Sequence, residues 1–310
     1  MSDITAEDIH SAIHMSKLRD YSGKFRELGG GEVNDTFVLD CGDQKVVFRF
    51  SRYPGNNTLR HEAQALSLMN IPNIPRLIFF DISASIKGKL WIAESYVPGH
   101  SVSSLTINQY RTLGGLLAQV HKVHAPVQSN VNLWEHFLYA SSHFGDEHTL
   151  LHHPDSSLKD LVHRAQSYFG QQTALFENVE KSLVHGDATP NNVLVEDDRV
   201  SLIDWEFSKF EDPMLDFSTI YYDDMEYNRG KWRPHISSAA KSALFEGYEA
   251  GGGSIDEERI QVWMNLDKLG AATYLYWKMY ESGHTMEEDQ VAQYRTDFQS
   301  LIESLQRNLP

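Results

Sequence analysis

The first hundred residues alternate between apolar and polar positions in short runs. The alternation is clearest over residues 26–50, where Gly29–Gly31 and Gly42 interrupt it. A two-residue repeat places one face of a strand against a core, so this part predicts β-strands joined by turns. "RLIFFDI" and "KLWIAESYV" predict two more strands, and Asn57 or Thr58 is positioned to cap a helix through "LRHEAQALSLM".

A different repeat appears further along the chain. Apolar side chains in residues 107–120 recur at spacings of three and four, and Thr106 stands where a helix cap is expected. Residues 158–179 and 236–306 are also predicted to be helical, with one break at "GYEAGGGSIDEE".

The change of repeat divides the chain in two. Residues 1–97 are predicted to form a small β-rich lobe that contains one helix, and residues 98–310 a larger, mostly helical lobe. Pro98 and Gly99 mark the predicted boundary, because this pair interrupts both helices and strands. The predicted fold class is therefore α+β, with two lobes.

One hairpin pattern, at residues 193–203, lies within the helical part. Two apolar runs flank an acidic turn, and polar residues stand at the open ends: Asp187 and Asn192 before the first run, and Asp204 after the second. Since the two ends of a hairpin meet, we expect these three side chains to converge. Carboxylate and amide oxygens suit Mg²⁺, and a further carboxylate can accept a hydroxyl proton, which together form the residue set of phosphoryl transfer. Each residue alone is also typical of a turn.

A phosphotransferase also needs a site for the phosphates of its nucleotide. "LGGGEVNDTF" supplies Gly30, Gly31 and Asn34 between two predicted strands, although a glycine run alone indicates only a turn. Arg49 stands in the apolar strand "VVFRF" and needs a partner there, which Glu62 of the next helix can provide. The pair would leave the guanidinium facing phosphate oxygens; a surface arginine on an edge strand is the alternative.

The connection between the predicted lobes is a candidate nucleotide-base site. In "WIAESYVPG", backbone groups near Glu94 and Tyr96 are positioned to hydrogen-bond an adenine.

Composition narrows the classes of partner. The chain has 310 residues and a net charge of −16, so its surface repels phosphate backbones and nucleic acid is not an expected partner. Such a charge favours cationic small molecules. Cys41 is the only cysteine, which excludes an internal disulfide and fits a cytoplasmic location. We expect neither a signal peptide nor membrane insertion, because no basic start or long apolar run is present.

With these motifs together, the chain resembles the aminoglycoside phosphotransferase and choline kinase superfamily, which has the protein-kinase-like fold. "HGDATPNNVL" is similar to its catalytic loop, "LIDWEFSKFEDPMLDFS" to its metal-binding segment and "LGGGEVNDTFVL" to its nucleotide loop. The choline/ethanolamine kinase branch is the most similar. The resemblance implies ATP and Mg²⁺ as cofactors, Asp187 as the catalytic base, Asn192 and Asp204 as metal ligands, and Arg49 as a contact of the ATP phosphates.

Departures from protein kinases favour a small-molecule acceptor. Gly186 replaces their arginine, Trp205 and Glu206 replace their Phe-Gly, and no Ala-Pro-Glu segment follows. Arg49 replaces the usual lysine, as it does in the choline kinase branch.

The last helical region resembles the segment of choline kinases whose aromatic rings surround the substrate ammonium. Trp277 and Tyr280 are one turn apart, and Tyr294 follows. Aromatic faces attract quaternary ammonium groups, so we predict that these residues bind a cationic amino alcohol such as choline or ethanolamine. Aromatic residues at this spacing are equally typical of a helical core, and both interpretations stay open.

Other functions compete with this prediction. An antibiotic phosphotransferase could hold a polycationic sugar with Asp223, Asp224 and Glu226, and thiamine, a sugar amine or another amino alcohol are further acceptors. A pseudokinase that only binds nucleotide is a different class, against which the intact catalytic set argues. A metal-binding protein is a third class, and its candidate ligands are His148, His152 and His153. The sequence does not indicate the oligomeric state.

Overall fold

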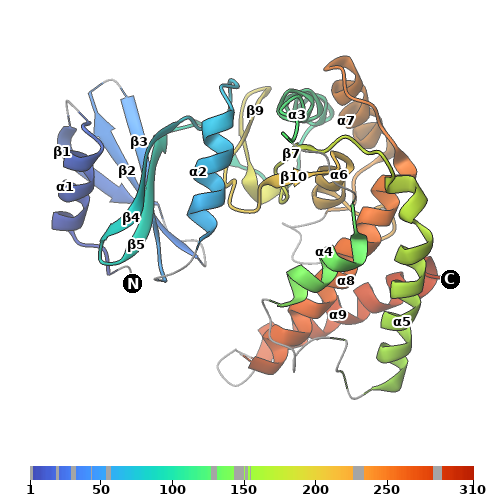
Figure 1. Cartoon of the computed structure of the whole chain (residues 1–310). Coiled ribbons are helices and arrows are strands. Elements are labelled where there is room, and N and C mark those ends of the chain that lie inside the picture. The colour runs from blue at the N-terminus through green and yellow to red at the C-terminus, as the bar shows by residue number, and fades with distance from the viewer. Residues whose placement is uncertain are drawn as a thin grey trace.

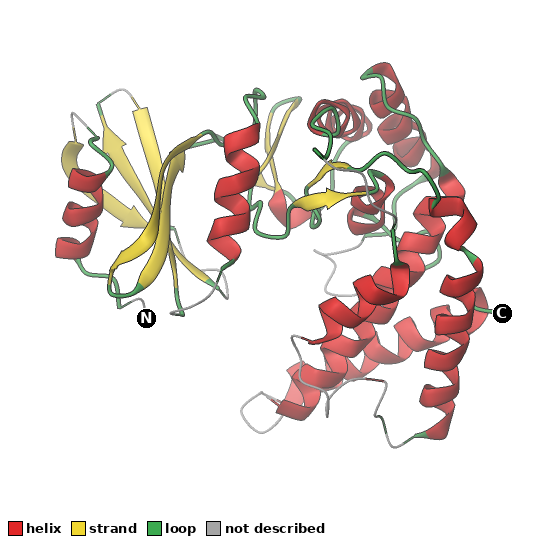
Figure 2. Cartoon of the chain, in the orientation of Figure 1, coloured by secondary structure: helices red, strands yellow, loops and turns green. Residues whose placement is uncertain are grey.

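The structure is a computed structural model of the chain. It describes residues 3–18, 21–28, 33–42, 44–53, 57–126, 131–142, 150, 153, 155–225, 234–281 and 288–310; for residues 21–23, 139–142, 280 and 281 only the backbone is described. The predicted α+β class is confirmed: strands gather at one end of the molecule and helices at the other (Figure 2).

The strands of the first part form one antiparallel sheet. Its order is β1-β2-β3-β5-β4. In the observed register Phe37 pairs with Phe48 and Arg49 with Ile92, so the members of each pair share one face of the sheet. The strand bounds are β1 Tyr21–Glu27, β2 Asn34–Cys41, β3 Gln44–Ser51, β4 Leu77–Ile86 and β5 Lys89–Ser95.

Two helices cover the two faces of this sheet (Figure 1). Helix α2, Thr58–Leu68, was expected and lies between the sheet and the helical part. Helix α1, Ala6–Met15, lies on the opposite face, so the expectation of one helix within residues 1–97 is wrong. Its signals were local: Thr5 and Asp8 form a capping box, and Ile9 and its helical neighbours face the core.

The second part is mostly helical. Thr106 caps α3 through a capping box with Gln109, as predicted. The remaining prediction needs two corrections: α5 ends at Gln171 before a short 3₁₀ helix, and the final region contains a further helix boundary after Glu281. The bounds are α3 Ile107–Val120, α4 Leu133–Ser142, α5 Ser156–Gln171, η3 Thr173–Phe176, α6 Met214–Ile220, α7 Ser238–Ala250, α8 Glu257–Glu281 and α9 Glu288–Asn308.

Short strands carry the polar loops of the second part. The predicted hairpin is present: Val193 pairs with Leu202 and Glu196 with Arg199, around a turn in which Asp197 has a left-handed backbone (φ 55°). The bounds are β6 His100–Ser101, β7 Ser182–Val184, η4 Pro190–Asn192, β8 Val193–Glu196, β9 Arg199–Leu202 and β10 Lys209–Glu211. β6 joins the hairpin, and β10 pairs with β7.

Helices α3 and α7 pack unusually closely because glycines meet at their crossing. A Cβ atom on Gly114 would lie 2.0 Å from the Leu244 carbonyl oxygen, and one on Gly247 would lie 1.9 Å from the Arg111 carbonyl oxygen. Any side chain would therefore push the helices apart. Tyr248, next to Gly247, is thereby held against His121 at the end of α3.

Among the described residues, no helix combines the length and the apolar composition that crossing a bilayer requires.

Candidate active site

The loop between β7 and β8 brings Asp187 and Asn192 together. The side-chain amide nitrogen of Asn192 (Nδ2) donates to both the backbone carbonyl oxygen and the Oδ2 atom of Asp187, each at 2.9 Å. Pro190 starts the single 3₁₀ turn that makes this approach possible. The Ile203 amide donates to the Asn192 carbonyl at 3.0 Å, so the two open ends of the hairpin meet as expected.

A buried carboxylate beneath the loop holds its backbone. Asp216 accepts hydrogen bonds from the amides of His185 at 2.9 Å and Gly186 at 2.8 Å. Its Oδ2 also lies 3.0 Å from His121 Nε2, and His121 Nδ1 lies 2.9 Å from the Tyr248 hydroxyl. Burial acts to raise the pKa of Asp216, but the contacts with His121 and the His185 amide lower it overall. Asp216 therefore stays ionised and fixes the residues just before Asp187.

Sequence reasoning did not single out Asp216. The available signal was a lone acid between Leu215 and Phe217 in an apolar run, since a buried charge needs partners. His185 holds the loop against the hairpin: its Nε2 lies 3.0 Å from the Ile203 carbonyl oxygen, and its ring packs on Trp205.

Gly186 is required at its position for two reasons. Its backbone is left-handed (φ 78°), and an added Cβ would lie 2.4 Å from the Phe207 carbonyl oxygen. The arginine that protein kinases place here would therefore clash with the segment after Asp204.

Asp204 connects the hairpin with the sheet. Arg49 of β3 donates to Asp204 Oδ1 at 2.7 Å and also pairs with Glu62 of α2, the partner predicted for it. The Trp205 amide donates to Glu62 at 3.2 Å. Arg49 is buried, so it is not a surface arginine, and its two carboxylate contacts join residues from both lobes.

The buried cluster around Arg49 contains three carboxyl groups, those of Glu62, Glu94 and Asp204, beside its one guanidinium. Glu94 of β5 is buried beside Arg49 and Glu62, and burial, reinforced by the negative charge of Glu62, raises its pKa well above the ordinary value. Burial likewise raises the pKa of Glu62 to about 7, with Arg49 opposing the shift and Asp204 adding to it. Among the described residues, neither Glu62 Oε2 nor Glu94 Oε2 has a hydrogen-bond partner. Asn192 and Asp204 carry amide and carboxylate oxygens, which are the donor types that suit Mg²⁺, and Arg49 contacts Asp204 Oδ1.

A contact between the lobes involves Asn34 and Glu206, which sequence reasoning did not connect. The Asn34 amide donates to Glu206 Oε2 at 3.2 Å, and both residues are buried. Burial and the nearby Asp204 charge raise the pKa of Glu206 to about 7. Asn34 therefore touches the segment after Asp204, while Gly30 and Gly31 lie outside the described residues.

The expected adenine contacts at the connection are only partly available. The Tyr96 amide already donates to the Lys45 carbonyl at 3.1 Å, so it cannot donate to an adenine in this arrangement. Glu94 lies within β5, where it pairs with Val47 and Leu77.

The three predicted acceptor aromatics have different surroundings. Tyr294 is 2% exposed and belongs to the hydrophobic core, so the structure does not support it as the wall of an open cage. Trp277 is half-buried, and the Lys278 ammonium lies 5.3 Å from the centre of its ring and 5.6 Å from that of Tyr274. The side chain of Tyr280 lies outside the described residues.

The acidic run proposed for a polycationic acceptor is already committed to internal pairs. Asp223 pairs with Lys241 at 3.2 Å, and Asp224 pairs with Lys268 and accepts from Ser304 at 2.7 Å. Glu226, His148 and His152 lie outside the described residues. Within the part of the chain that is described, no group of three or more His, Cys, Asp or Glu side chains is placed to hold a metal ion.

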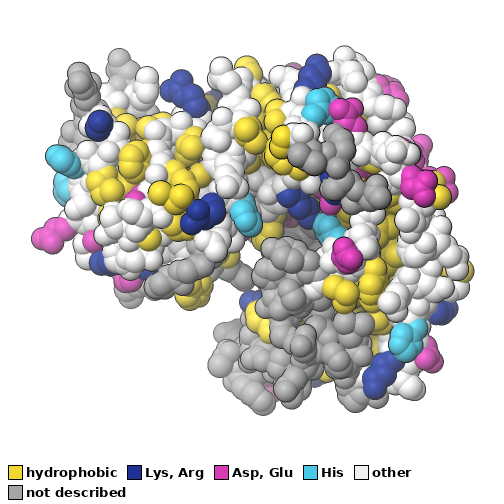
Figure 3. Space-filling view, viewed as in Figure 1, with side chains coloured by type: hydrophobic (Ala, Val, Ile, Leu, Met, Phe, Trp, Pro, Cys, Tyr) yellow, Lys and Arg dark blue, Asp and Glu magenta, His cyan; other side chains and the backbone are white. Residues whose placement is uncertain are grey.

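The space-filling view shows a hollow between the sheet and the helical part (Figure 3). Basic, acidic and histidine side chains gather at this hollow on the face shown. The Arg49–Asp204 contact joins the two parts, so the polar cluster lies where they meet.

The model of the phosphotransferase enzyme family matches residues 24–263. Protein LicA of Haemophilus influenzae is 23% identical over 242 residues, which are 74% of this chain and 64% of that protein. The match thus spans less than two thirds of this relative.

Solved structures share the fold. Choline kinase LicA from Streptococcus pneumoniae has a TM-score of 0.69 at 17% identity, covering 98% of this chain and 100% of that one. A putative aminoglycoside phosphotransferase from Ralstonia eutropha JMP134 has a TM-score of 0.67 at 16% identity, covering 98% of each chain. The two differ in the acceptor that their names state, so this likeness establishes the protein-kinase-like fold and not the acceptor.

Proposed function

The chain belongs to the phosphotransferase enzyme family, and from that premise we propose that it transfers the γ-phosphoryl group of ATP, with Mg²⁺, to the hydroxyl of a small cationic amino alcohol such as choline or ethanolamine. One observation supports the proposal. The Asp187–Asn192 contact and the Arg49–Asp204 ion pair lie at the two ends of one hairpin, and the Ile203 backbone amide joins these ends by donating to the Asn192 carbonyl.

Asp187 is the proposed base. Asn192 donates to its Oδ2, which orients the carboxylate that would accept the hydroxyl proton of the acceptor. Asp216 fixes the backbone just before Asp187 through two amide hydrogen bonds, so the base is positioned before the acceptor arrives.

Asn192 and Asp204 are the residues that would hold Mg²⁺, which neutralises charge on the β- and γ-phosphates when it is bound. Arg49 is the proposed phosphate contact. Its guanidinium is held by Glu62 on one side and Asp204 on the other, and a planar donor with several N–H groups suits phosphate oxygens.

The names of the relatives support an amino alcohol as acceptor, because LicA proteins include a choline kinase. The net charge of −16 also favours a cationic acceptor over an anionic one. The internal pairing of Asp223 and Asp224 weakens the case for an aminoglycoside. Trp277 remains the proposed aromatic contact, and the Lys278 ammonium lies at its face.

A substrate panel tests the proposal. Phosphate transfer from ATP with Mg²⁺ is measured for choline, ethanolamine, aminopropanol, thiamine and an aminoglycoside, with Asp187→Asn as the inactive control. We expect choline or ethanolamine to be turned over. Turnover of the aminoglycoside alone would contradict the amino-alcohol assignment, and nucleotide binding without any transfer would indicate a pseudokinase.

A further inference from the structure

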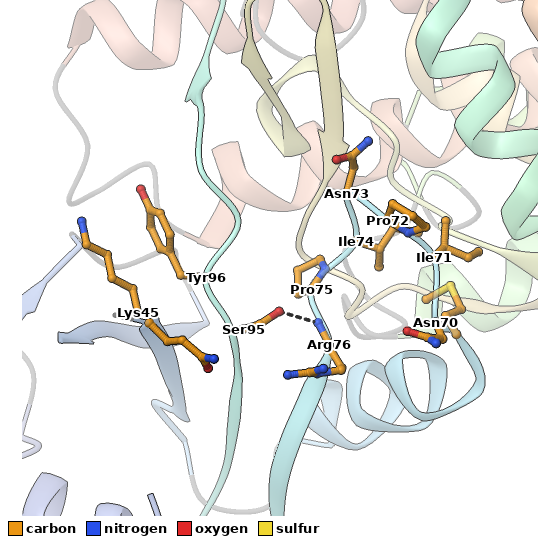
Figure 4. Close-up of a pocket in the computed structure, with 12 residues that line it drawn as sticks. Lys45, Asn70, Ile71, Pro72, Asn73, Ile74, Pro75, Arg76, Ser95 and Tyr96 are labelled. Atoms are coloured by element: carbon orange, nitrogen blue, oxygen red, sulfur yellow. Dashed lines mark hydrogen bonds between the residues drawn. The ribbon is translucent and has the colours of Figure 1, made fainter. Parts of the chain in front are cut away.

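Polar side chains converge at some places in the molecule and not at others. In the hollow where β5 leaves the sheet, the backbones of Lys45 and Arg76 are hydrogen-bonded to consecutive residues at the end of β5, so the two cations lie on opposite faces (Figure 4). Beneath the proposed catalytic loop, in contrast, side chains do converge. Tyr248, His121 and Asp216 form a buried chain of hydrogen bonds there, and the proposed function so far uses only Asp216.

The ring of Tyr248 is fixed by close packing. The glycine crossing of α3 and α7 places it beside His121, and the Phe217 ring packs edge-on against it with 5.0 Å between the ring centres. The turn after α7 also approaches closely, since a Cβ atom on Gly253 would lie 2.2 Å from Tyr248 Cε1. Held in this way, the ring directs its hydroxyl at His121 Nδ1, 2.9 Å away.

The hydrogen bonds of this chain determine where the imidazole proton of His121 lies. Among the described residues, His121 Nδ1 is the only hydrogen-bond partner of the buried Tyr248 hydroxyl, whose proton needs an acceptor. Nδ1 must then carry no proton, which places the imidazole proton on Nε2, 3.0 Å from Asp216 Oδ2. A doubly protonated ring would also donate to Asp216, but it would leave the tyrosine proton without an acceptor.

We propose that Tyr248 and His121 are positioning residues for the proposed base, and that they act by holding His121 as the neutral tautomer with its proton on Nε2. In this state Asp216 Oδ2 accepts from His121 and from the His185 amide, while Oδ1 accepts from the Gly186 amide. Three donors around one buried carboxylate oppose its rotation, which fixes the two peptide groups before the base. This role rests on the proposed function, which makes the residue after Gly186 the base.

A separate contact keeps the loop in place when this chain is cut. The Ala188 amide donates to Thr219 Oγ1 at 3.0 Å, and the Thr219 hydroxyl donates to the Asp216 carbonyl at 2.8 Å. Loss of His121 should therefore change the alignment of the base more than the position of the loop. Poor alignment of a base lowers kcat and leaves substrate binding largely intact.

Kinetics of choline phosphorylation by the whole protein test the positioning role. His121→Leu removes both hydrogen bonds, and we expect kcat to fall by about 10- to 30-fold while the KM values for choline and ATP stay within about 2-fold. His121→Gln is the rescue variant, because its amide can still donate to Asp216, and its kcat should stay within about 3-fold of the wild type. Tyr248→Phe should lower kcat by about 3-fold in the wild type but not in His121→Leu, where its partner is already absent.

Leu305→Ala is the control for lost stability. Leu305 is fully buried in α9 and lies outside this chain of hydrogen bonds. Its truncation should lower the melting temperature at least as far as His121→Leu does, because it leaves a cavity in the core. We expect kcat of the folded protein to stay at the wild-type level.

Nuclear magnetic resonance of the histidine rings tests the tautomer without any turnover. In protein with isotope-labelled histidine nitrogens, the signals that His121→Gln removes identify His121. We expect a neutral ring with its proton on Nε2 at the pH of the kinetic measurements, and a changed Nδ1 signal in Tyr248→Phe.

Three results would overturn the proposal. They are a His121 ring that is doubly protonated or carries its proton on Nδ1, a kcat that falls equally in His121→Gln and His121→Leu, and a kcat that falls as far in Leu305→Ala as in His121→Leu. A wild type that phosphorylates no acceptor of the panel would instead overturn the proposed function and the positioning role with it, while the resonance signals still decide the tautomer.

Discussion

The proposed catalytic cluster, which comprises Asp187, Asp204 and Asp216, differs from helices α8 and α9 in how its side chains are held in place. In the cluster each carboxylate accepts a hydrogen bond: Asp187 from Asn192, Asp204 from Arg49, and Asp216 from the Gly186 backbone amide. On α8 and α9, Tyr294 is part of the core and Trp277 has the Lys278 ammonium at its face. The difference indicates that hydrogen bonds of the folded chain already hold the residues proposed for phosphate transfer, whereas the described side chains of the proposed acceptor aromatics do not form an open cage.

The largest expected effect is on the support of the catalytic loop. Asp216→Ala leaves the amides of His185 and Gly186 without their acceptor and His121 without its partner. We expect the free energy of unfolding to fall by about 3–5 kcal/mol, the usual loss when one member of a buried polar network is removed. Urea unfolding measures it. Asp223→Ala, which breaks a more exposed ion pair, should lower the free energy of unfolding by less than about 1 kcal/mol. Equal losses in the two variants would contradict the role of Asp216 as the support of the loop.

Asp187→Asn tests the chemical centre of the same region. The amide keeps the shape of the side chain and cannot accept a proton, so turnover should fall by at least about 10²-fold while nucleotide binding persists. Steady-state kinetics and nucleotide titration measure the two effects. Asp197→Asn in the hairpin turn is the matched control, since asparagine tolerates its left-handed backbone. Turnover near the wild-type level in Asp187→Asn would refute the base assignment.

Asp204→Asn separates metal binding from the base. We expect the Mg²⁺ dependence of ATP affinity to be lost, with binding at saturating Mg²⁺ weakened by about 30-fold, because the asparagine keeps the left-handed backbone but carries no charge. A Mg²⁺ titration of nucleotide affinity checks it. If the Mg²⁺ dependence is unchanged, Asp204 serves only as a partner of Arg49.

Trp277→Ala addresses the acceptor side of the comparison. If its ring contacts the ammonium, the KM for choline should rise by about 5- to 30-fold and the KM for ATP should barely change. If the ring serves only in packing, stability should fall by roughly 3–5 kcal/mol and the KM values should stay the same. Both KM values and the melting temperature are therefore measured together.

Lys278→Met sharpens this test. Removing the ammonium that lies over Trp277 and Tyr274 should lower the KM for choline by about 2- to 5-fold, because the substrate no longer competes with it. Lys241→Met is the control, since Lys241 also lies over two rings, those of Tyr221 and Phe245. A rise in KM for Lys278→Met would mean that the lysine supports acceptor binding.

The smallest expected effect is on the pH dependence of stability. Burial acts to raise the pKa of Asp224, but Lys268, Ser304 and Asn308 lower it overall. A depressed pKa contributes stability that is present above the unfolded value and is lost as the pH falls through the folded value. The free energy of unfolding of the wild type should therefore fall more steeply below about pH 4 than that of Asp224→Asn. If the stabilities of the two proteins fall in parallel with pH, the contribution of the Asp224–Lys268 pair to stability is contradicted.

Local patterns determined much of the fold. The alternation of residues 26–50 predicts the strands, and the acidic turn predicts the hairpin with its two ends meeting. Helix α1 was also readable from its capping box, although the single-helix expectation overlooked it. These features depend on neighbours a few residues apart, and backbone geometry there is set by the local sequence.

By itself the sequence determined the residue types of the candidate site and their spacing, including Asp187 with Asn192 and Arg49 with Glu62. Only the tertiary structure decided contacts between distant segments, such as Arg49 with Asp204, 155 residues apart, and Asn34 with Glu206, 172 apart. It also placed Tyr294 in the core. A helical repeat states which residues share a face, but the packing of that face depends on every other element around it. For this reason the residues that meet around the hairpin could be predicted from the sequence, while the surroundings of the proposed acceptor aromatics could not.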